Sequence, residues 1–116
     1  MIGAGEMHLY FTRAYERAIR KLLSEDARRE METAIVAAPD AAPVIRGTGG
    51  IRKLRWAGSG RGKRGGIRAI YFWCAAPEAV YMLTAYAKAD RDDLTAADRR
   101  ALARLVAEIE RERRRR

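Results

Sequence analysis

The chain has 116 residues, enough for one compact domain with a thin hydrophobic core. Hydrophobic residues make up 48% of it, which argues against a disordered chain, and its single cysteine, Cys74, excludes an internal disulfide. Lysine and arginine number 24 against 15 acidic residues, and the net charge of +9 favours partners that carry phosphates or acidic groups.

The sequence carries no signal for secretion or for a membrane. Its first residues have neither a basic start nor an apolar stretch of signal-peptide length, and no run approaches the roughly 20 apolar residues of a membrane span. We therefore expect a cytoplasmic protein without membrane contact. We interpret residues 1–116 as a single domain, with residues 1–6 as a loose N-terminal extension and residues 111–116 as a basic tail.

The first part of the chain predicts a short strand followed by two helices. In residues 7–11 every second side chain is apolar, which is the pattern of a strand with Met7, Leu9 and Phe11 on one face. Apolar residues then recur at helical spacing: Phe11, Tyr15, Ile19 and Leu22. Ser24 is a suitable N-cap for a second helix, which Pro39 and Pro43 end. The apolar stripe expected for that helix is Met31, Ala34, Ile35 and Ala38.

The remainder predicts three strands and a last helix. The strands are rich in aromatic and β-branched residues and span residues 51–57, 67–75 and 79–87. Thr95 and Asp98 form a capping-box pattern at the start of the helix. Its buried stripe is Leu102, Leu105, Val106 and Ile109. The order β-α-α-β-β-β-α predicts an α+β domain with a mostly antiparallel sheet, two N-terminal helices and a C-terminal helix.

Positive charge is concentrated in the middle of the chain. No acidic residue lies between Asp40 and Glu78, a window that holds eight cations: Arg46, Arg52, Lys53, Arg55, Arg61, Lys63, Arg64 and Arg68. Lys53 and Arg55 are two residues apart, so they leave the same face of one strand, and Arg68 can approach them from the next strand. Clustered cations repel one another unless a polyanion binds them, which predicts a nucleic-acid site.

Two glycine motifs and a metal site are excluded. Gly60, Gly62 and Gly65 have the spacing of a dinucleotide-binding fingerprint, but they lead into a strand rather than a helix. The sequence around Gly62 also lacks the serine or threonine that a P-loop needs for magnesium. One histidine, His8, and one cysteine are too few for a structural zinc site, so we expect neither a metal nor a cofactor.

Three segments carry a resemblance to a known family. They are residues 44–55, 60–71 and 81–88, which read VIRGTGGIRKLR, GRGKRGGIRAIY and YMLTAYAK. Together they resemble the HigB branch of the RelE/ParE toxin superfamily, most densely over residues 44–94. The resemblance implies a RelE-like fold and the toxin of a type II toxin–antitoxin system that cleaves mRNA on the ribosome. It also implies neutralisation by a HigA-type helix-turn-helix antitoxin, through which the pair would bind operator DNA.

The same resemblance implies the site residues. Four basic residues match catalytic positions of the family, and a tyrosine is a further candidate for proton transfer: Lys53, Arg55, Arg68, Lys88 and Tyr86. Four others are predicted to bind RNA or the ribosome: Arg52, Arg61, Lys63 and Arg64. The chain departs from the RelE pattern in two ways. Ala89 stands where a further arginine is expected, and no tyrosine follows Arg91.

These residues suit a cleavage in which the 2′-hydroxyl of the RNA attacks the adjacent phosphate. Arginine keeps its proton and would stabilise the transition state, whereas a lysine crowded by arginines gives up its proton more readily and is a candidate general base. Three alternatives stay open: a ParE-like DNA gyrase poison on the same fold, a non-catalytic RNA-binding module, and an inactive toxin that Ala89 would mark.

Overall fold

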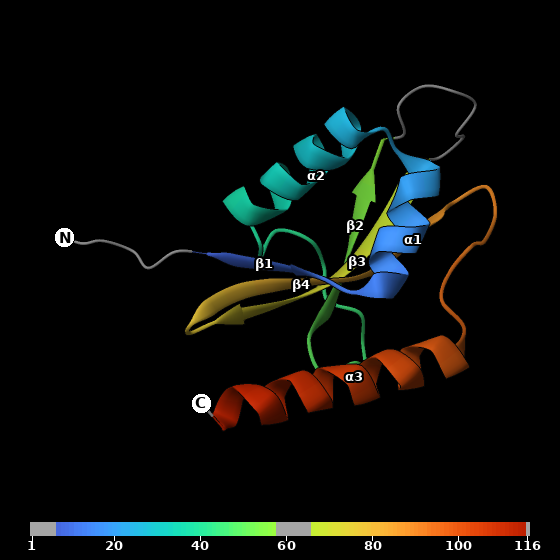
Figure 1. Cartoon of the computed structure of the whole chain (residues 1–116). Coiled ribbons are helices and arrows are strands. Elements are labelled where there is room, and N and C mark those ends of the chain that lie inside the picture. The colour runs from blue at the N-terminus through green and yellow to red at the C-terminus, as the bar shows by residue number, and fades with distance from the viewer. Residues whose placement is uncertain (1–6, 58–65, 116) are drawn as a thin grey trace.

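The computed structural model describes residues 7–57 and 66–115, which form three helices and one four-stranded sheet (Figure 1). In chain order the elements are β1 (His8–Phe11), α1 (Arg13–Leu22), α2 (Glu25–Ala37), β2 (Ile51–Trp56), β3 (Ile67–Ala75), β4 (Glu78–Ala87) and α3 (Ala96–Arg114). The predicted order and the predicted α+β class are both confirmed. No helix within these ranges is long and apolar enough to cross a membrane.

The sheet pairs the first strand of the chain with the last. Its strand order is β1-β4-β3-β2, with β3 antiparallel to both β2 and β4, and with β1 parallel to β4. The sheet is therefore mostly antiparallel, as predicted. Because β1 pairs only with β4, the N-terminal strand lies at one edge and the cation-rich β2 at the other.

Each helix begins at a serine or threonine N-cap, whose hydroxyl binds a backbone N–H three residues later in the chain. The hydroxyl of Thr12 accepts the N–H of Tyr15 at 3.0 Å and starts α1, and that of Ser24 accepts the N–H of Ala27 at 3.1 Å and starts α2. Thr95 and Asp98 form the predicted capping box of α3. Helix α1 begins at Arg13, so Phe11 belongs to β1 and not to the first helical turn.

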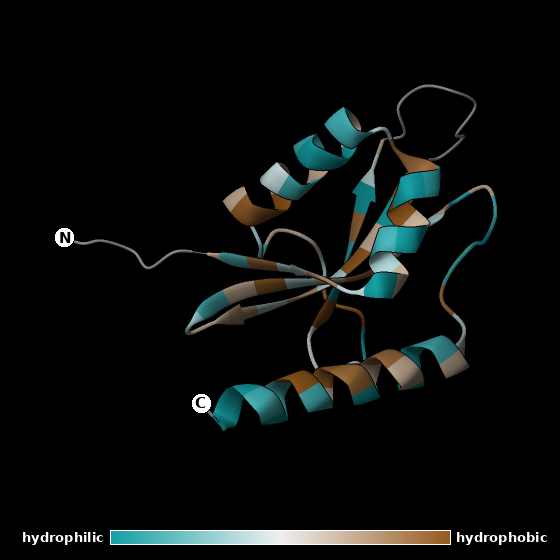
Figure 2. Ribbon diagram, viewed as in Figure 1, coloured by the Kyte–Doolittle hydropathy of each residue, from teal (hydrophilic) through white to brown (hydrophobic). Residues whose placement is uncertain are grey.

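The helices cover opposite faces of the sheet (Figures 1 and 2). Helices α1 and α2 pack against one face through Tyr15, Ile19 and Met31, which are fully buried against strand residues such as Tyr71 and Met82. Helix α3 packs against the other face, where Val106 meets a second set of buried residues: Ile51, Ile70, Phe72 and Leu83. Two thin cores result, one on each side of the sheet.

The buried stripe of α2 differs from the prediction. Met31 and Ile35 are buried as expected, but Ala34 and Ala38 are exposed, and Glu32 is buried in their place. Two donors bind the same oxygen of Glu32: the hydroxyl of Tyr15 at 2.7 Å and Nε of Arg28 at 2.8 Å. Burial of Glu32 is tolerated because both a cation and a hydroxyl satisfy its carboxylate.

Candidate active site

The central cations lie on the same face of the sheet that α3 covers. The register places Arg55 opposite Arg68, and Arg68 opposite Tyr86, so these three side chains leave one face. Lys53 is opposite Ile70 and points the same way. The register thus bears out the predicted approach of Arg68 to Arg55, and Lys53 lies two residues along β2 on the same face. We call Lys53, Arg55, Arg68, Tyr86 and Lys88 the cationic face.

The backbone places Lys88 beside this cluster. Lys88 follows the last residue of β4, and its N–H donates to the carbonyl of Gly66 at 3.1 Å, which continues the ladder beyond β3. Gly66 has φ +67°, and a Cβ there would lie 2.2 Å from the carbonyl oxygen of Trp56. Glycine is therefore required where the chain enters β3, two residues before Arg68.

Burial differs strongly among the members of the cationic face. The side chain of Arg68 is packed into the sheet, with the residue only 7% exposed, and its Nη1 donates to the carbonyl of Ile67 at 3.3 Å. Arg55 is exposed, and Lys53 and Lys88 are half-buried. An anion at this site would therefore contact Arg55 at the surface, with Arg68 held rigidly behind it.

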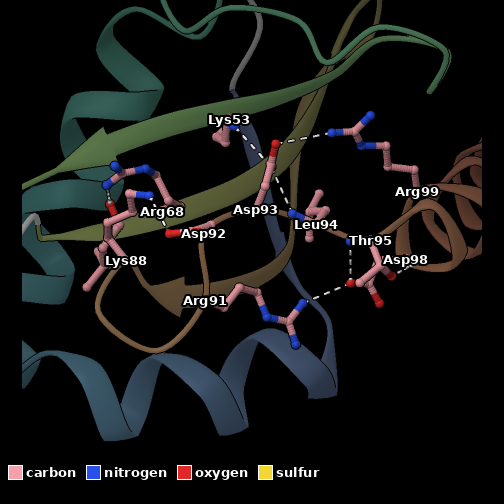
Figure 3. Close-up of polar contacts among 11 residues, drawn as sticks. Lys53, Arg68, Lys88, Arg91, Asp92, Asp93, Leu94, Thr95, Asp98 and Arg99 are labelled. Atoms are coloured by element: carbon pink, nitrogen blue, oxygen red, sulfur yellow. Dashed lines mark hydrogen bonds and ion pairs between the residues drawn. The ribbon is translucent and has the colours of Figure 1, made fainter.

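Two aspartates from the loop between β4 and α3 pair with the two lysines (Figure 3). Asp93 lies 3.2 Å from Nζ of Lys53, and Asp92 lies 2.9 Å from Nζ of Lys88. The N–H of Leu94 and the charge of Lys53 hold the pKa of Asp93 below its usual range. Lys53 thus has an acidic partner that the acid-free window around it in the sequence did not indicate.

Arg91 extends the cluster from the same loop (Figure 3). Its guanidinium lies 5.5 Å from the centre of the Tyr86 ring and pairs with Asp98 at 2.8 Å. Arg91 thus brings a cation to the cationic face two residues beyond Ala89, the position where the sequence lacks an expected arginine.

Tyr86 carries a buried hydroxyl without a hydrogen-bond partner among the residues that the structure describes. Burial raises the pKa of this hydroxyl, and the negative charge of Asp93 adds to the effect, whereas Arg68 and Arg91 oppose it. A hydroxyl in this state keeps its proton at neutral pH. It is suited to donate a hydrogen bond or a proton to an anion rather than to act as a base.

The family model for the RelE toxin of the RelE/RelB toxin–antitoxin system matches residues 7–115. The chain belongs to the RelE toxin family. Membership in this family implies an mRNA endoribonuclease that inhibits translation, acting as the toxin of a toxin–antitoxin system.

Two solved structures share the fold of this RelE family member. A variant of the E. coli toxin RelE with two arginines changed to alanine, in the free state, is 18% identical with a TM-score of 0.53. That match covers 73% of this chain and 86% of the other. A chain of the intact E. coli RelBE toxin–antitoxin complex is 19% identical with a TM-score of 0.50, and the match covers 67% and 92% of the two chains.

Not every predicted site residue reaches the cationic face of this RelE family member. Arg52 points to the opposite face of β2, where its Nη1 donates to the carbonyls of Asp40 and Ala42 at 3.0 and 2.7 Å. It also lies 5.8 Å from the centre of the Trp73 ring. These contacts tie the segment after α2 to the sheet. The predicted RNA or ribosome contacts Arg61, Lys63 and Arg64 fall outside the described residues.

The sequence analysis did not single out Asp93 or Arg91, although both lie at the cationic face. The sequence does hold a clue that Asp93 has a structural role. It stands with Asp92 just before the N-cap Thr95, where the start of a helix favours negative charge. Nothing local indicates that this helix docks beside β2. Among the described residues no three histidine, cysteine or acidic side chains come together as a metal site.

Proposed function

We propose that this RelE family member is a HigB-type toxin that cleaves mRNA on the ribosome. The observation that supports the proposal is the in-register arrangement of Arg55, Arg68 and Tyr86 on one face of the sheet, with Lys53 beside them. A cluster of this kind matches the charge of a phosphodiester that gains negative charge during cleavage.

The reaction needs three contributions from the cationic face. The 2′-hydroxyl attacks the adjacent phosphorus, its proton passes to a base, and the 5′-oxygen leaves with a proton from an acid. Arg55 and Arg68 stabilise the extra charge on the phosphoryl oxygens. Tyr86 is the candidate to protonate the leaving oxygen, because its hydroxyl carries a proton at neutral pH and has no hydrogen-bond partner among the described residues. Lys53 and Lys88 are the candidates to accept or orient the proton of the 2′-hydroxyl.

Dependence on the ribosome follows from the weakness of this acid–base machinery. The cationic face has no histidine and no pair of converging carboxylates, so holding the RNA in line for attack must contribute much of the rate. The decoding site would hold it in that way. We therefore propose that translated mRNA is cleaved well and the same RNA in free solution poorly, and that the protein acts in the cytoplasm.

The HigB assignment and the antitoxin rest on the sequence resemblance over residues 44–94. We propose a HigA-type helix-turn-helix partner that covers the cationic face with acidic groups and supplies the contacts to operator DNA. We also propose that residues 1–116 act as one domain and that Arg61, Lys63 and Arg64 bind phosphates of the ribosome or message.

Cleavage mapping in a reconstituted translation system tests the proposal. Wild type is compared with Lys53→Ala and with Arg55→Ala, because Arg55 is exposed and its loss should not disturb folding. Each change should lower the rate of cleavage within translated codons by about 100-fold. Arg17→Ala is the matched control: it removes one exposed positive charge from α1, on the opposite face of the sheet, and should cleave like wild type.

The results of this experiment also distinguish ribosome-dependent cleavage from the other functions that this fold could have. Cuts in free RNA at the same rate as in translated mRNA would contradict the dependence on the ribosome. Intact mRNA together with inhibited DNA gyrase would indicate a ParE-like poison. Intact mRNA that still binds the protein, with a steep dependence on salt, would indicate a non-catalytic RNA-binding module.

A further inference from the structure

Asp93 joins three parts of the fold through one carboxylate (Figure 3). Its Oδ1 accepts from Nζ of Lys53 on β2 at 3.2 Å and from the N–H of Leu94 at 2.8 Å. Its Oδ2 accepts from Nη2 of Arg99 on α3 at 3.1 Å. Both oxygens are therefore engaged, and the carboxylate lies between the strand that carries the cationic face and the helix that covers it.

We propose that Asp93 is a positioning residue that holds the ammonium group of Lys53 in place for RNA cleavage. This inference rests on the proposed function and adds a residue that acts on the reaction through Lys53. Asp93 need not contact the RNA. Its role is to fix one of the three N–H donors of Lys53, so that the other two remain directed toward the phosphodiester. In this role Lys53 acts as an ammonium that orients the RNA, and it does not accept the proton of the 2′-hydroxyl.

The surroundings of Asp93 distinguish it from an ordinary surface ion pair. The backbone N–H of Leu94 fixes one of its oxygens, and the side chains of Lys53 and Asp93 are 23% and 45% exposed. The Leu94 N–H and the positive charges around Asp93 lower the pKa of its carboxyl, so the group stays ionised at neutral pH. A carboxylate held at three points loses less side-chain entropy in forming such a pair than one held by the lysine alone.

The neighbouring Asp92 provides a natural comparison. It also pairs with a lysine of the cationic face, Lys88, at 2.9 Å. Its side chain is 96% exposed, however, and that of Lys88 is 37% exposed. An exposed pair of this kind contributes little fixed geometry. The two adjacent aspartates thus have the same charge and the same type of partner but differ in how firmly they hold it.

A second role for Asp93 would have the opposite effect on activity. A carboxylate between Lys53 and Arg99 could occupy the place of an RNA phosphate and have to be displaced by substrate. Removing its charge would then strengthen RNA binding and lower KM. If Asp93 positions Lys53 instead, removing the charge lowers kcat and leaves KM nearly unchanged, because the RNA still meets the same cations.

The test compares Asp93→Asn with Asp92→Asn in the reconstituted translation system. Asparagine retains an oxygen for the Leu94 N–H and removes the charge that holds Lys53. We expect Asp93→Asn to lower kcat about 10-fold or more with KM within about 2-fold, and Asp92→Asn to resemble wild type. In a Lys53→Ala background Asp93→Asn should cause no further loss, because both changes act through the same group.

Arg99→Gln separates positioning from the docking of α3. It removes the contact of Asp93 with α3 and leaves the contact with Lys53. We expect it to lower the midpoint of urea unfolding as Asp93→Asn does, but to keep kcat. Equal losses of kcat in the two variants would show that Asp93 acts only by holding the helix, and would overturn the proposal.

Three other results would also overturn it: kcat of Asp93→Asn equal to wild type, a lower KM in that variant, or a further loss in the Lys53→Ala background. Failure of the proposed function is recognised separately, because wild type would then leave translated mRNA intact. In that case the positioning role is refuted together with the reaction that it serves.

Discussion

Arg55 and Arg68 lie directly opposite each other on β2 and β3, so two positive side chains leave the same face of the sheet as a cross-strand pair. Like charges in this arrangement destabilise a sheet. Arg68 is buried at this position, which adds the cost of desolvating its charge. The fold thus brings two like charges together at the place where a phosphodiester would bind.

Replacing Arg55 should therefore affect stability and activity in opposite directions. Arg55→Gln removes the repulsion while keeping the length of the side chain, and we expect the free energy of unfolding to rise by about 0.2–1 kcal/mol. Cleavage of translated mRNA should fall by about 100-fold because one charge at the transition state is lost. Urea unfolding and cleavage kinetics measure the two effects. A variant that loses both stability and activity would contradict the role given to this pair.

Tyr86→Phe distinguishes packing from chemistry at the buried hydroxyl. The hydroxyl makes no hydrogen bond within the described part of the chain, so its removal should leave stability unchanged or raise it by about 1 kcal/mol. Its loss should nevertheless lower kcat, because a proton donor for the leaving oxygen disappears. Unchanged cleavage by a folded Tyr86→Phe protein would assign Tyr86 to packing alone.

The buried network around Arg28 should control stability without controlling cleavage. Arg28 pairs with Glu16 and Glu32 at 2.8 Å each, and it lies 4.9 Å from the centre of the Phe11 ring. Arg28→Ala leaves Glu32 buried without its cation, which should cost about 3–5 kcal/mol of unfolding free energy in urea titrations.

The double variant Arg28→Met with Glu32→Leu is the control, because it removes both charges and should recover most of that loss. A cost below about 1 kcal/mol for Arg28→Ala would show that the pair behaves as if it were exposed. Cleavage per folded molecule should not change in either variant, since the network lies under α1 and α2 on the other face of the sheet.

Asp98 predicts a pH dependence of stability at the start of α3. Its hydrogen bonds with Thr95 lower the pKa of its carboxyl from the ordinary value of 3.8. A group with a lowered folded-state pKa contributes its full stability above the unfolded-state value and loses it as the pH falls through the folded-state value. Stability should therefore be constant near neutral pH and decrease in acid below about pH 4.

Asp98→Asn should reduce this acid sensitivity and lower stability near neutral pH by about 0.5–1 kcal/mol, the cost of a weakened helix cap. Urea unfolding between pH 2 and pH 7 measures both effects. Asp93, whose pKa is also lowered, retains its own contribution in that variant, so some acid sensitivity should remain. An unchanged pH profile in Asp98→Asn would contradict the assignment.

The elements of the fold could be predicted because their signals are local. Ser24 and Thr95 cap their helices through residues three positions away, and the strands follow from short runs of aromatic and β-branched residues. Even the approach of Arg68 to Arg55 follows from strand alternation once β2 and β3 are neighbours. The alternation also places Arg52 on the opposite face, which its assignment to the RNA contacts did not take into account.

Other features depend on contacts that no local pattern encodes. Asp93 meets Lys53 across 40 positions of the chain, because α3 docks beside β2. Glu32 occupies a helix position that a polar residue normally exposes, and its burial depends on Arg28 and on Tyr15 from another helix. At both sites the fold supplies a partner to a charged side chain from a distant or neighbouring element.

The parallel pairing of β1 with β4 also affects how the molecule forms. The hydroxyl of Thr12 binds the carbonyl of Leu83, a residue 71 positions later, and β1 has its pairing partner on the same distant strand. Contacts of this sequence separation form late and make folding slow. During synthesis, α1 and α2 emerge long before the surface that they cover. A nascent chain interrupted before β4 could still pair β2 with β3, but it would lack the strand that joins β1 to the sheet, together with Tyr86 and Lys88. A truncated product would therefore carry only part of the cationic face.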